Sequence, residues 1–198
     1  LQQLQSDVRW QLRDGQWASA QWKTQLANDD LQGQTQGQWQ ATASGPGTVD
    51  LQAQVPRAQV NRLYRYLPRH LPADVRTYVR DSLRQGTLSG LQVRVKGDLA
   101  KLPMPQPRDG EFRFAGHLQG VEMAYVPPSL QSAGSLPWPS LQGLQGDLVF
   151  ERQGMKLSNA SARFGEGRQA VQIGPLNASI PHLARDPQLE VKAELKGP

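Results

Sequence analysis

The fold of this chain is decided by residues 56–102, PRAQVNRLYRYLPRHLPADVRTYVRDSLRQGTLSGLQVRVKGDLAKL. Its first thirty residues predict two short amphipathic helices, because apolar residues recur at helical spacing with arginines between them. The apolar positions are Val60, Leu63, Tyr64 and Leu67 in the first helix and Val75, Tyr78, Val79 and Leu83 in the second. Pro68 and Pro72 separate the helices, since proline disfavours helical geometry in the residue before it. The second helix is expected to end at Gly86.

Beyond Gly86 the periodicity changes from helical to alternating. Leu91, Val93 and Val95 are apolar, and the residues between them are polar. A period of two indicates a strand with one dry and one wet face. Residues 56–86 are therefore predicted as a helical pair between two strand regions, 1–55 and 87–198.

The two strand regions consist of short alternating segments separated by turn residues such as Asp14-Gly15 and Gln153-Gly154. The predicted strands span 5–13, 17–26, 31–41, 48–55, 88–99, 110–118, 120–126, 143–151, 154–164, 169–180 and 188–196. Short turns favour hairpins, so we expect a mainly β fold built as a long antiparallel meander. The prolines between Val126 and Ser140 exclude a central strand and predict a loop at 126–140.

Nearly every predicted strand has one apolar face, so one surface of the sheet is expected to be apolar throughout. The candidate lining residues are Leu91, Val93, Val95, Phe112, Phe114, Val121, Met123, Tyr125, Leu144, Leu148, Phe150, Met155, Leu157, Val171, Ile173, Leu189 and Val191. Such a surface can be covered by a second sheet in a closed sandwich, or can curl into a trough that holds another apolar molecule. Alternation alone leaves both open.

The formal net charge of +5 is concentrated in the helical segment. A basic patch is expected there, formed by Arg62, Arg65, Arg69, Arg76, Arg80 and Arg84. It is either the solvated face of the two helices or a site for an acidic protein partner. We expect no nucleic-acid partner, because no zinc-finger, RRM or KH pattern accompanies the charge.

Catalytic and metal-binding patterns are absent from the sequence. The chain has no cysteine, which excludes disulfides, and its three histidines, His70, His117 and His182, stand far apart. No H-E-x-x-H, Walker A or G-x-S-x-G pattern occurs. We therefore expect no enzymatic activity, no cofactor and no metal.

Several motifs together resemble a known family. They are Tyr66-Leu67-Pro68, Leu71-Pro72, Gly97-Asp98-Leu99 and the tracts 83–90, 112–120, 138–148 and 174–180. This pattern is similar to the YhdP branch of the AsmA-like proteins of Gram-negative bacteria, over residues 48–198. Residues 1–47 share only the rhythm of strands.

The resemblance implies a taco-shaped β-groove with an apolar lining, which shelters phospholipid acyl chains between the inner and outer membranes. It also implies a periplasmic location, proteins at both membranes as partners, and a parent protein anchored in the inner membrane. The chain is then expected to be one section of a longer protein, since it starts without methionine and both ends look internal. The alternative is a closed β-sandwich assembly module whose arginine-rich helices bind an acidic protein.

Overall fold

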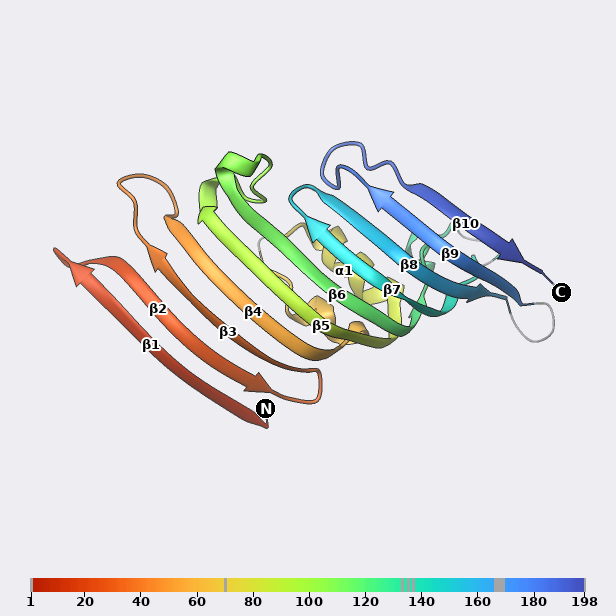
Figure 1. Ribbon diagram of the computed structural model, residues 1–198, viewed down its shortest axis with the longest axis horizontal. Coiled ribbons are helices and arrows are strands. Elements are labelled where there is room, and N and C mark those ends of the chain that lie inside the picture. The colour runs from red at the N-terminus through yellow and green to blue at the C-terminus, as the bar shows by residue number, and fades with distance from the viewer. Residues whose placement is uncertain are drawn as a thin grey trace.

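The computed structural model describes residues 2–69, 71–132, 134, 136, 138–165 and 170–197. Ten strands form one antiparallel sheet in which each strand pairs with its neighbours in sequence (Figure 1). The strands are β1 Gln3–Arg13, β2 Gln16–Ala27, β3 Leu31–Gln40, β4 Thr48–Gln59, β5 Leu83–Asp98, β6 Gly110–Met123, β7 Leu141–Glu151, β8 Gly154–Phe164, β9 Val171–Ile180 and β10 Glu190–Lys196. The sheet is an open, curled meander, which confirms the predicted fold class of a groove and not of a sandwich.

The helical segment is shorter than the sequence predicts. Residues 56–59 continue β4, and only η1 (Val60–Arg65) follows as a 3₁₀ helix, while α1 spans Ala73–Ser82. The predicted second helix is wrong at its end, because Leu83 already pairs with Met123 as the first residue of β5. Cross-strand pairing therefore overrides the local helical periodicity at both ends of the segment. Three further 3₁₀ turns are η2 Leu99–Lys101, η3 Pro107–Asp109 and η4 Pro128–Leu130.

The described residues form ten strands, one fewer than the eleven that the sequence predicts. The segments 110–118 and 120–126 are a single strand, β6, which passes through Gly120 at a φ of +59°. The predicted loop at 126–140 contains η4, and three of its residues, Ala133, Ser135 and Pro137, lie outside the described residues. His70 and residues 166–169, which include the start of the strand predicted at 169, also lie outside them.

Six neighbouring strands, β4 to β9, share an irregularity that bends the sheet. In a regular strand, successive residues on one face are two positions apart. In each of these six strands, one pair of successive residues on the apolar face is three positions apart. The steps are Val55 to Ala58, Leu88 to Leu91, Leu118 to Val121, Leu141 to Leu144, Leu157 to Ala160 and Ile173 to Leu176. In β5 to β8 the residue before the second apolar position has a positive φ, at Gly90, Gly120, Gly143 and Asn159. An extra residue in a strand bends it and increases its twist, which gives the sheet its curl.

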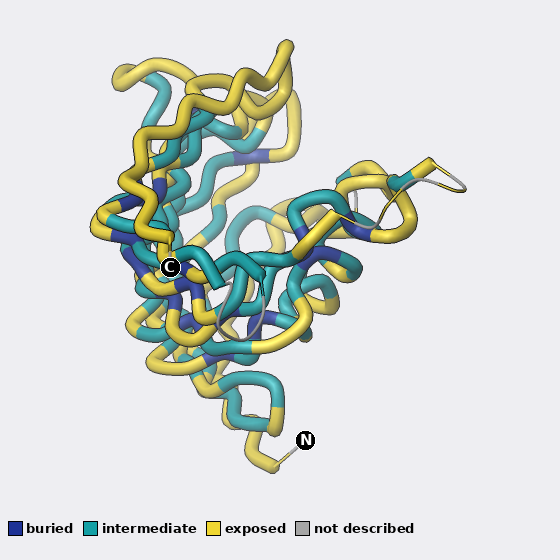
Figure 2. Tube along the Cα trace, turned by 90° about the vertical axis from the view of Figure 1, so that its right-hand side faces the viewer, coloured by how far each residue is buried: buried dark blue, intermediate teal, exposed yellow. Residues whose placement is uncertain are grey.

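The helical layer, defined as η1, α1 and the described residues between them, lies on the apolar face of the sheet (Figures 1 and 2). η1 inserts Val60, which is 1% exposed, and Leu63 against the sheet. The cluster that they cover contains Leu88, Leu118, Val121, Leu144, Leu157, Ala160, Ala162 and Leu176. The core therefore sits between the helical layer and one half of the strands' length.

Candidate functional site

Strand pairing aligns the residues of the apolar face into rows that run from strand to strand. One row passes through Val8, Trp22, Gly37, Leu51, Val95 and Phe112, from β1 to β6. A second row runs through Ser6, Thr24, Thr35, Ala53, Val93, Phe114, Phe150, Met155 and Ile180, from β1 to β9. Because residues directly opposite one another share a face, the two rows lie on one face of the sheet. The first row is apolar in β1 and in β4 to β6, and the second is polar in β1 to β3, with Ser6, Thr24 and Thr35, and apolar from β4 to β9.

Most of the predicted lining residues lie in strands on this face. Val121, Leu144 and Leu157 are buried beneath the helical layer. The half-buried positions are Leu91, Val93, Val95, Phe112, Phe114, Met123, Leu148, Phe150, Met155, Val171 and Ile173, and Val191 is exposed. The face is thus covered at one part and accessible at another.

Two predicted lining residues lie outside the strands. Tyr125 follows β6; its carbonyl accepts a hydrogen bond of 3.2 Å from the Tyr78 hydroxyl, and its ring lies 5.8 Å from that of Trp138. Leu189 precedes β10 and is 61% exposed. Tyr125 therefore belongs to the contacts of the helical layer, and Leu189 to the turn before the last strand.

The half of the face away from the helical layer is an open apolar groove. The rings of Phe112 and Phe114 stand 5.0 Å apart there, and those of Trp10 and Trp17 stand 5.9 Å apart near the β1–β2 turn. Trp10 and Trp17 are each 57% exposed. The described residues therefore leave aromatic and aliphatic side chains of this face open to solvent.

Sequence reasoning missed several of the residues under the helical layer, chiefly Leu88, Leu118 and Leu176. They fall out of phase with the strand alternation because each is separated from the next apolar position by three residues. Their positions could have been predicted from two apolar residues three positions apart with a glycine or asparagine between them, which indicates a bulge in the strand. Met104, which is part of the β5–β6 connection and is fully buried, carries no such signal.

The opposite face of the sheet is polar and internally paired. Arg94 forms ion pairs with Asp50 and, at 3.5 Å, with Glu111, so that β4, β5 and β6 are joined on this side. The hydrogen bond donated by Arg94 holds the pKa of Asp50 below its usual range. A shallow hollow of about 400 Å³ lies here too; apart from Trp22 and Gly37 its lining is polar or charged, which does not suit an apolar ligand.

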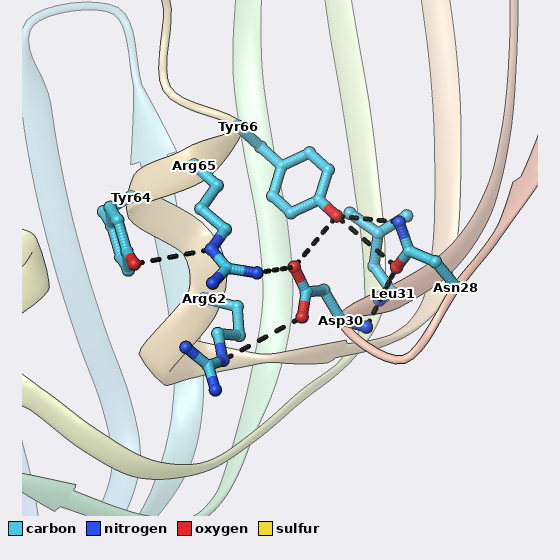
Figure 3. A network of polar contacts seen from close by, with 7 residues as sticks. All are labelled: Asn28, Asp30, Leu31, Arg62, Tyr64, Arg65 and Tyr66. Atoms are coloured by element: carbon cyan, nitrogen blue, oxygen red, sulfur yellow. Dashed lines mark hydrogen bonds and ion pairs between the residues drawn. The ribbon is translucent and has the colours of Figure 1, made fainter. Parts of the chain in front are cut away.

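A network of polar contacts fixes η1 to the turn between β2 and β3 (Figure 3). The Asp30 carboxylate accepts a 2.9 Å hydrogen bond from Arg65, pairs with Arg62 at 3.9 Å and accepts from the Tyr66 hydroxyl at 3.3 Å. Asn28 donates to the Tyr66 hydroxyl at 3.0 Å, and its amide oxygen accepts from the backbone N–H of Asp30. The helical layer is thus held over the apolar face at its β2–β3 side.

Most arginines of the predicted basic patch bind within the molecule. Besides Arg62 and Arg65, Arg76 donates to the Leu67 carbonyl at 2.8 Å. Arg80 pairs with Asp81 at 2.7 Å, and Arg84 pairs with Glu122 at 3.3 Å. The remaining predicted member, Arg69, lies between η1 and α1. The contacts of Arg62, Arg65 and Arg76 hold parts of the helical layer in place, whereas Arg84 links β5 to β6 and Arg80 binds its neighbour in α1.

The residues with possible chemistry are few. His117 lies 2.9 Å from Asp147 on the polar face, and Asn159 donates to the same carboxylate at 2.8 Å. The Asn159 hydrogen bond, followed by that of His117, lowers the pKa of Asp147. Among the described residues no three His, Asp or Glu side chains stand close enough to hold a metal ion.

A comparison of the chain with family models identifies its family. The model described as "YhdP protein" matches residues 1–198. The chain belongs to the YhdP family. The match includes residues 1–47, where the sequence resembles the family only in its alternation of strands and turns. Neither the curated proteins nor the solved structures include a significant match.

Membership of the YhdP family makes this an AsmA-like chain and indicates an envelope protein of a Gram-negative bacterium. In the described part of the chain, no helix combines the length and apolar character needed to span a bilayer.

Proposed function

We propose that this YhdP-family chain is a section of a periplasmic groove that shelters phospholipid acyl chains during transfer between the inner and outer membranes. The observation that carries the proposal is the apolar face: its residues pair in register from β1 to β9, and half of it is left open by the helical layer. On this proposal the groove exchanges lipids with proteins at both membranes.

The size of the groove suits acyl chains. Ten strands enclose nine gaps, and neighbouring strands lie about 4.8 Å apart, so the groove measures roughly 43 Å across the strands. Each methylene group that leaves water for an apolar surface contributes about 0.8 kcal/mol. A tail lying across several strands is therefore held without any polar recognition.

The chemistry of the lining favours movement over fixed binding. Rows such as Val93, Phe114 and Phe150 offer dispersion contacts of similar strength from strand to strand. A tail can slide along such rows without breaking hydrogen bonds at each step. The role requires no bond to be made or broken, and we propose it as a non-enzymatic one.

Photo-crosslinking on β6 tests the proposal. Phe114 and Arg113 are neighbours on the same strand, so their side chains point to opposite faces of the sheet. A photoreactive amino acid at position 114 is expected to capture radiolabelled phospholipid in cells, and the same amino acid at position 113 is not. Equal labelling at both positions, or none at 114, would contradict a lipid-lined interior.

A charge substitution gives the functional counterpart. Phe114→Asp places a carboxylate on the apolar face and is expected to impair lipid transfer, whereas Arg113→Asp changes only the polar face. The matched variants must first show equal expression and equal helix and strand content by circular dichroism. Equal transfer defects in two folded variants would argue against passage along the apolar face.

The second candidate, capture of an acidic protein by the basic patch, gains no support from the structure. Five of its six arginines already contact carboxylates or carbonyl oxygens of this chain. The sandwich that this candidate assumes is replaced by a single curled sheet.

A further inference from the structure

The apolar face changes its chemistry along the order of the strands. In β1 to β3 its second row consists of the hydroxyl residues Ser6, Thr24 and Thr35. From β4 to β9 the same row continues through apolar residues only, which are Ala53, Val93, Phe114, Phe150, Met155 and Ile180. The floor of the groove therefore has a mixed section over β1 to β3 and an apolar section over β4 to β9.

The aromatic residues divide in the same way. All tryptophans within strands lie in β1 to β3, and all phenylalanines within strands lie in β6 to β8. Trp22 and Trp39 are half-buried on the face that carries the hydroxyl row. A tryptophan ring joins an apolar body to a polar N–H, and in bilayers it gathers at the level of the headgroups. The mixed section thus has the chemistry of a membrane interface, and the apolar section that of the hydrocarbon core.

The mixed section offers hydrogen-bond donors to a ligand. The Ser6 and Thr24 hydroxyls lie 2.7 Å apart, so one of their two hydrogens lies between them and the other can reach an acceptor in the groove. The Trp22 N–H meets the Thr35 hydroxyl only at 3.5 Å, which makes a weak hydrogen bond, and Thr35 itself donates to the Gln52 carbonyl. A hydroxyl of the Ser6–Thr24 pair and the Trp22 N–H are therefore available to a bound acceptor.

We propose that a phospholipid in this groove lies lengthwise, with its glycerol ester region over β1 to β3 and its acyl tails over β4 to β9. This orientation rests on the proposed function. Ester carbonyls accept hydrogen bonds and cannot donate them, so they suit the donors of Thr24 and Trp22. The reversed lipid would place its carbonyls over Phe114 and Phe150, where the described residues of the row offer no side-chain donor to replace water.

The apolar section is long enough for a tail. Six strands enclose five gaps of about 4.8 Å, so β4 to β9 extend roughly 24 Å along the groove. The hydrocarbon layer of one bilayer leaflet is about 15 Å thick, half of the whole core. A tail whose ester end lies at β3 therefore ends within the apolar section.

Positional quenching tests the orientation. One single-tryptophan reporter retains Trp22 and the other carries Phe150→Trp, with phenylalanine at the remaining tryptophan positions in both. Phosphatidylglycerol brominated next to its ester carbonyls is expected to quench Trp22 more strongly than the same lipid brominated near the tail ends, and the reporter at position 150 is expected to show the opposite order. The same order at both reporters would overturn the orientation alone. Absence of quenching at both would overturn the proposed function together with it.

A second measurement keeps the native tryptophans. The double variant Ser6→Ala/Thr24→Val removes both hydroxyls of the pair with little change in volume. It is expected to weaken binding of ester-linked phosphatidylglycerol about fivefold, as the loss of one neutral hydrogen bond implies. Binding of the ether-linked analogue, which has no carbonyls, is expected to stay unchanged. Each lipid is measured by its displacement of the brominated lipid from the chain.

Ser19→Ala/Thr48→Val is the matched control. It makes the same two changes on the polar face, in β2 and β4, and is expected to leave the binding of both lipids unchanged. Circular dichroism confirms that each variant is folded. An equal loss for the ester and ether lipids, or no loss for the ester lipid, would overturn the orientation while leaving lipid binding in the groove, and so the proposed function, intact.

Discussion

The same leucine-to-alanine change is expected to have very different costs at two places on the apolar face. Leu144 in β7 lies under the helical layer and is 2% exposed, whereas Leu4 in β1 is 57% exposed. Leu144→Ala leaves a cavity in a packed core and is expected to lower the free energy of unfolding by about 3 kcal/mol. Leu4→Ala removes a side chain that is less than half buried and leaves no enclosed cavity, so its expected cost is about 1 kcal/mol.

Thermal unfolding monitored by circular dichroism measures this difference. In a chain of this length about 1 kcal/mol shifts the Tm by roughly 2–4 °C, so Leu144→Ala is expected to lower it by about 6–12 °C and Leu4→Ala by at most about 4 °C. The protein is kept dilute so that contacts between copies do not contribute. Equal Tm shifts would refute the reasoning, because they would mean that the face of β1 is covered in solution.

Three further changes test the helical layer, the polar face and the strand packing. Asp30→Asn removes the ion pairs that hold η1 and is expected to speed hydrogen exchange across residues 60–66, whereas Asp29→Asn in the same turn is expected to leave it unchanged. Asp50→Asn is expected to lower the free energy of unfolding at neutral pH, as measured by chemical denaturation. The difference in this free energy between the variant and the unaltered protein should narrow as the pH falls below about 4. A carboxylate whose pKa is lowered on folding stabilises the protein only while it is ionised, so its contribution is lost on protonation. Gly37→Ala places a Cβ 2.5 Å from the Trp22 ring and is expected to cost about 1–3 kcal/mol with a change in tryptophan fluorescence; an unchanged spectrum and Tm would contradict the packing of Trp22 over Gly37.

The alternation of apolar and polar residues predicts the sheet well, because each strand carries this pattern within its own sequence. Leu91, Val93 and Val95 lie on one face of β5 as their spacing indicates, and short turns lead to antiparallel neighbours in chain order. The resemblance to YhdP-branch proteins adds the groove, since periodicity alone does not distinguish a curled sheet from a sandwich.

The helical segment is where local signals fail. The periodicity around Leu83 is equally compatible with the last turn of a helix and the first residue of a strand, and pairing with Met123 decides for the strand. Tyr125 continues the alternation of Val121 and Met123 but lies beyond β6, where Tyr78 binds its carbonyl. Both outcomes depend on partners 40 and 47 residues away in the sequence, which local periodicity does not reveal.

The partners of charged residues are equally hidden in the sequence. Arg80 pairs with the adjacent Asp81, but other arginines of the helical segment look unpaired because their acids are remote: Asp30 binds Arg65 from the β2–β3 turn, and Glu122 binds Arg84 from β6. Only the fold brings these groups together. The burial of Leu88 and Leu118 was also not predicted from the sequence. Each lies three positions from the next residue on the apolar face, and this spacing interrupts the alternation by which lining residues are identified.

The most direct test of the central claim is to ask where the acyl chains of a bound phospholipid lie. Trp22 stands on the apolar face of β2, and Trp138 packs against Tyr125 in the loop after η4. Single-tryptophan variants that retain only one of the two, with phenylalanine at the other tryptophan positions, are mixed with phospholipid brominated on its acyl chains or with the unbrominated lipid. The account predicts that the brominated lipid quenches the fluorescence of Trp22 strongly and that of Trp138 weakly. Quenching of Trp138 alone, or none at Trp22 when lipid is bound, would contradict a groove that shelters acyl chains.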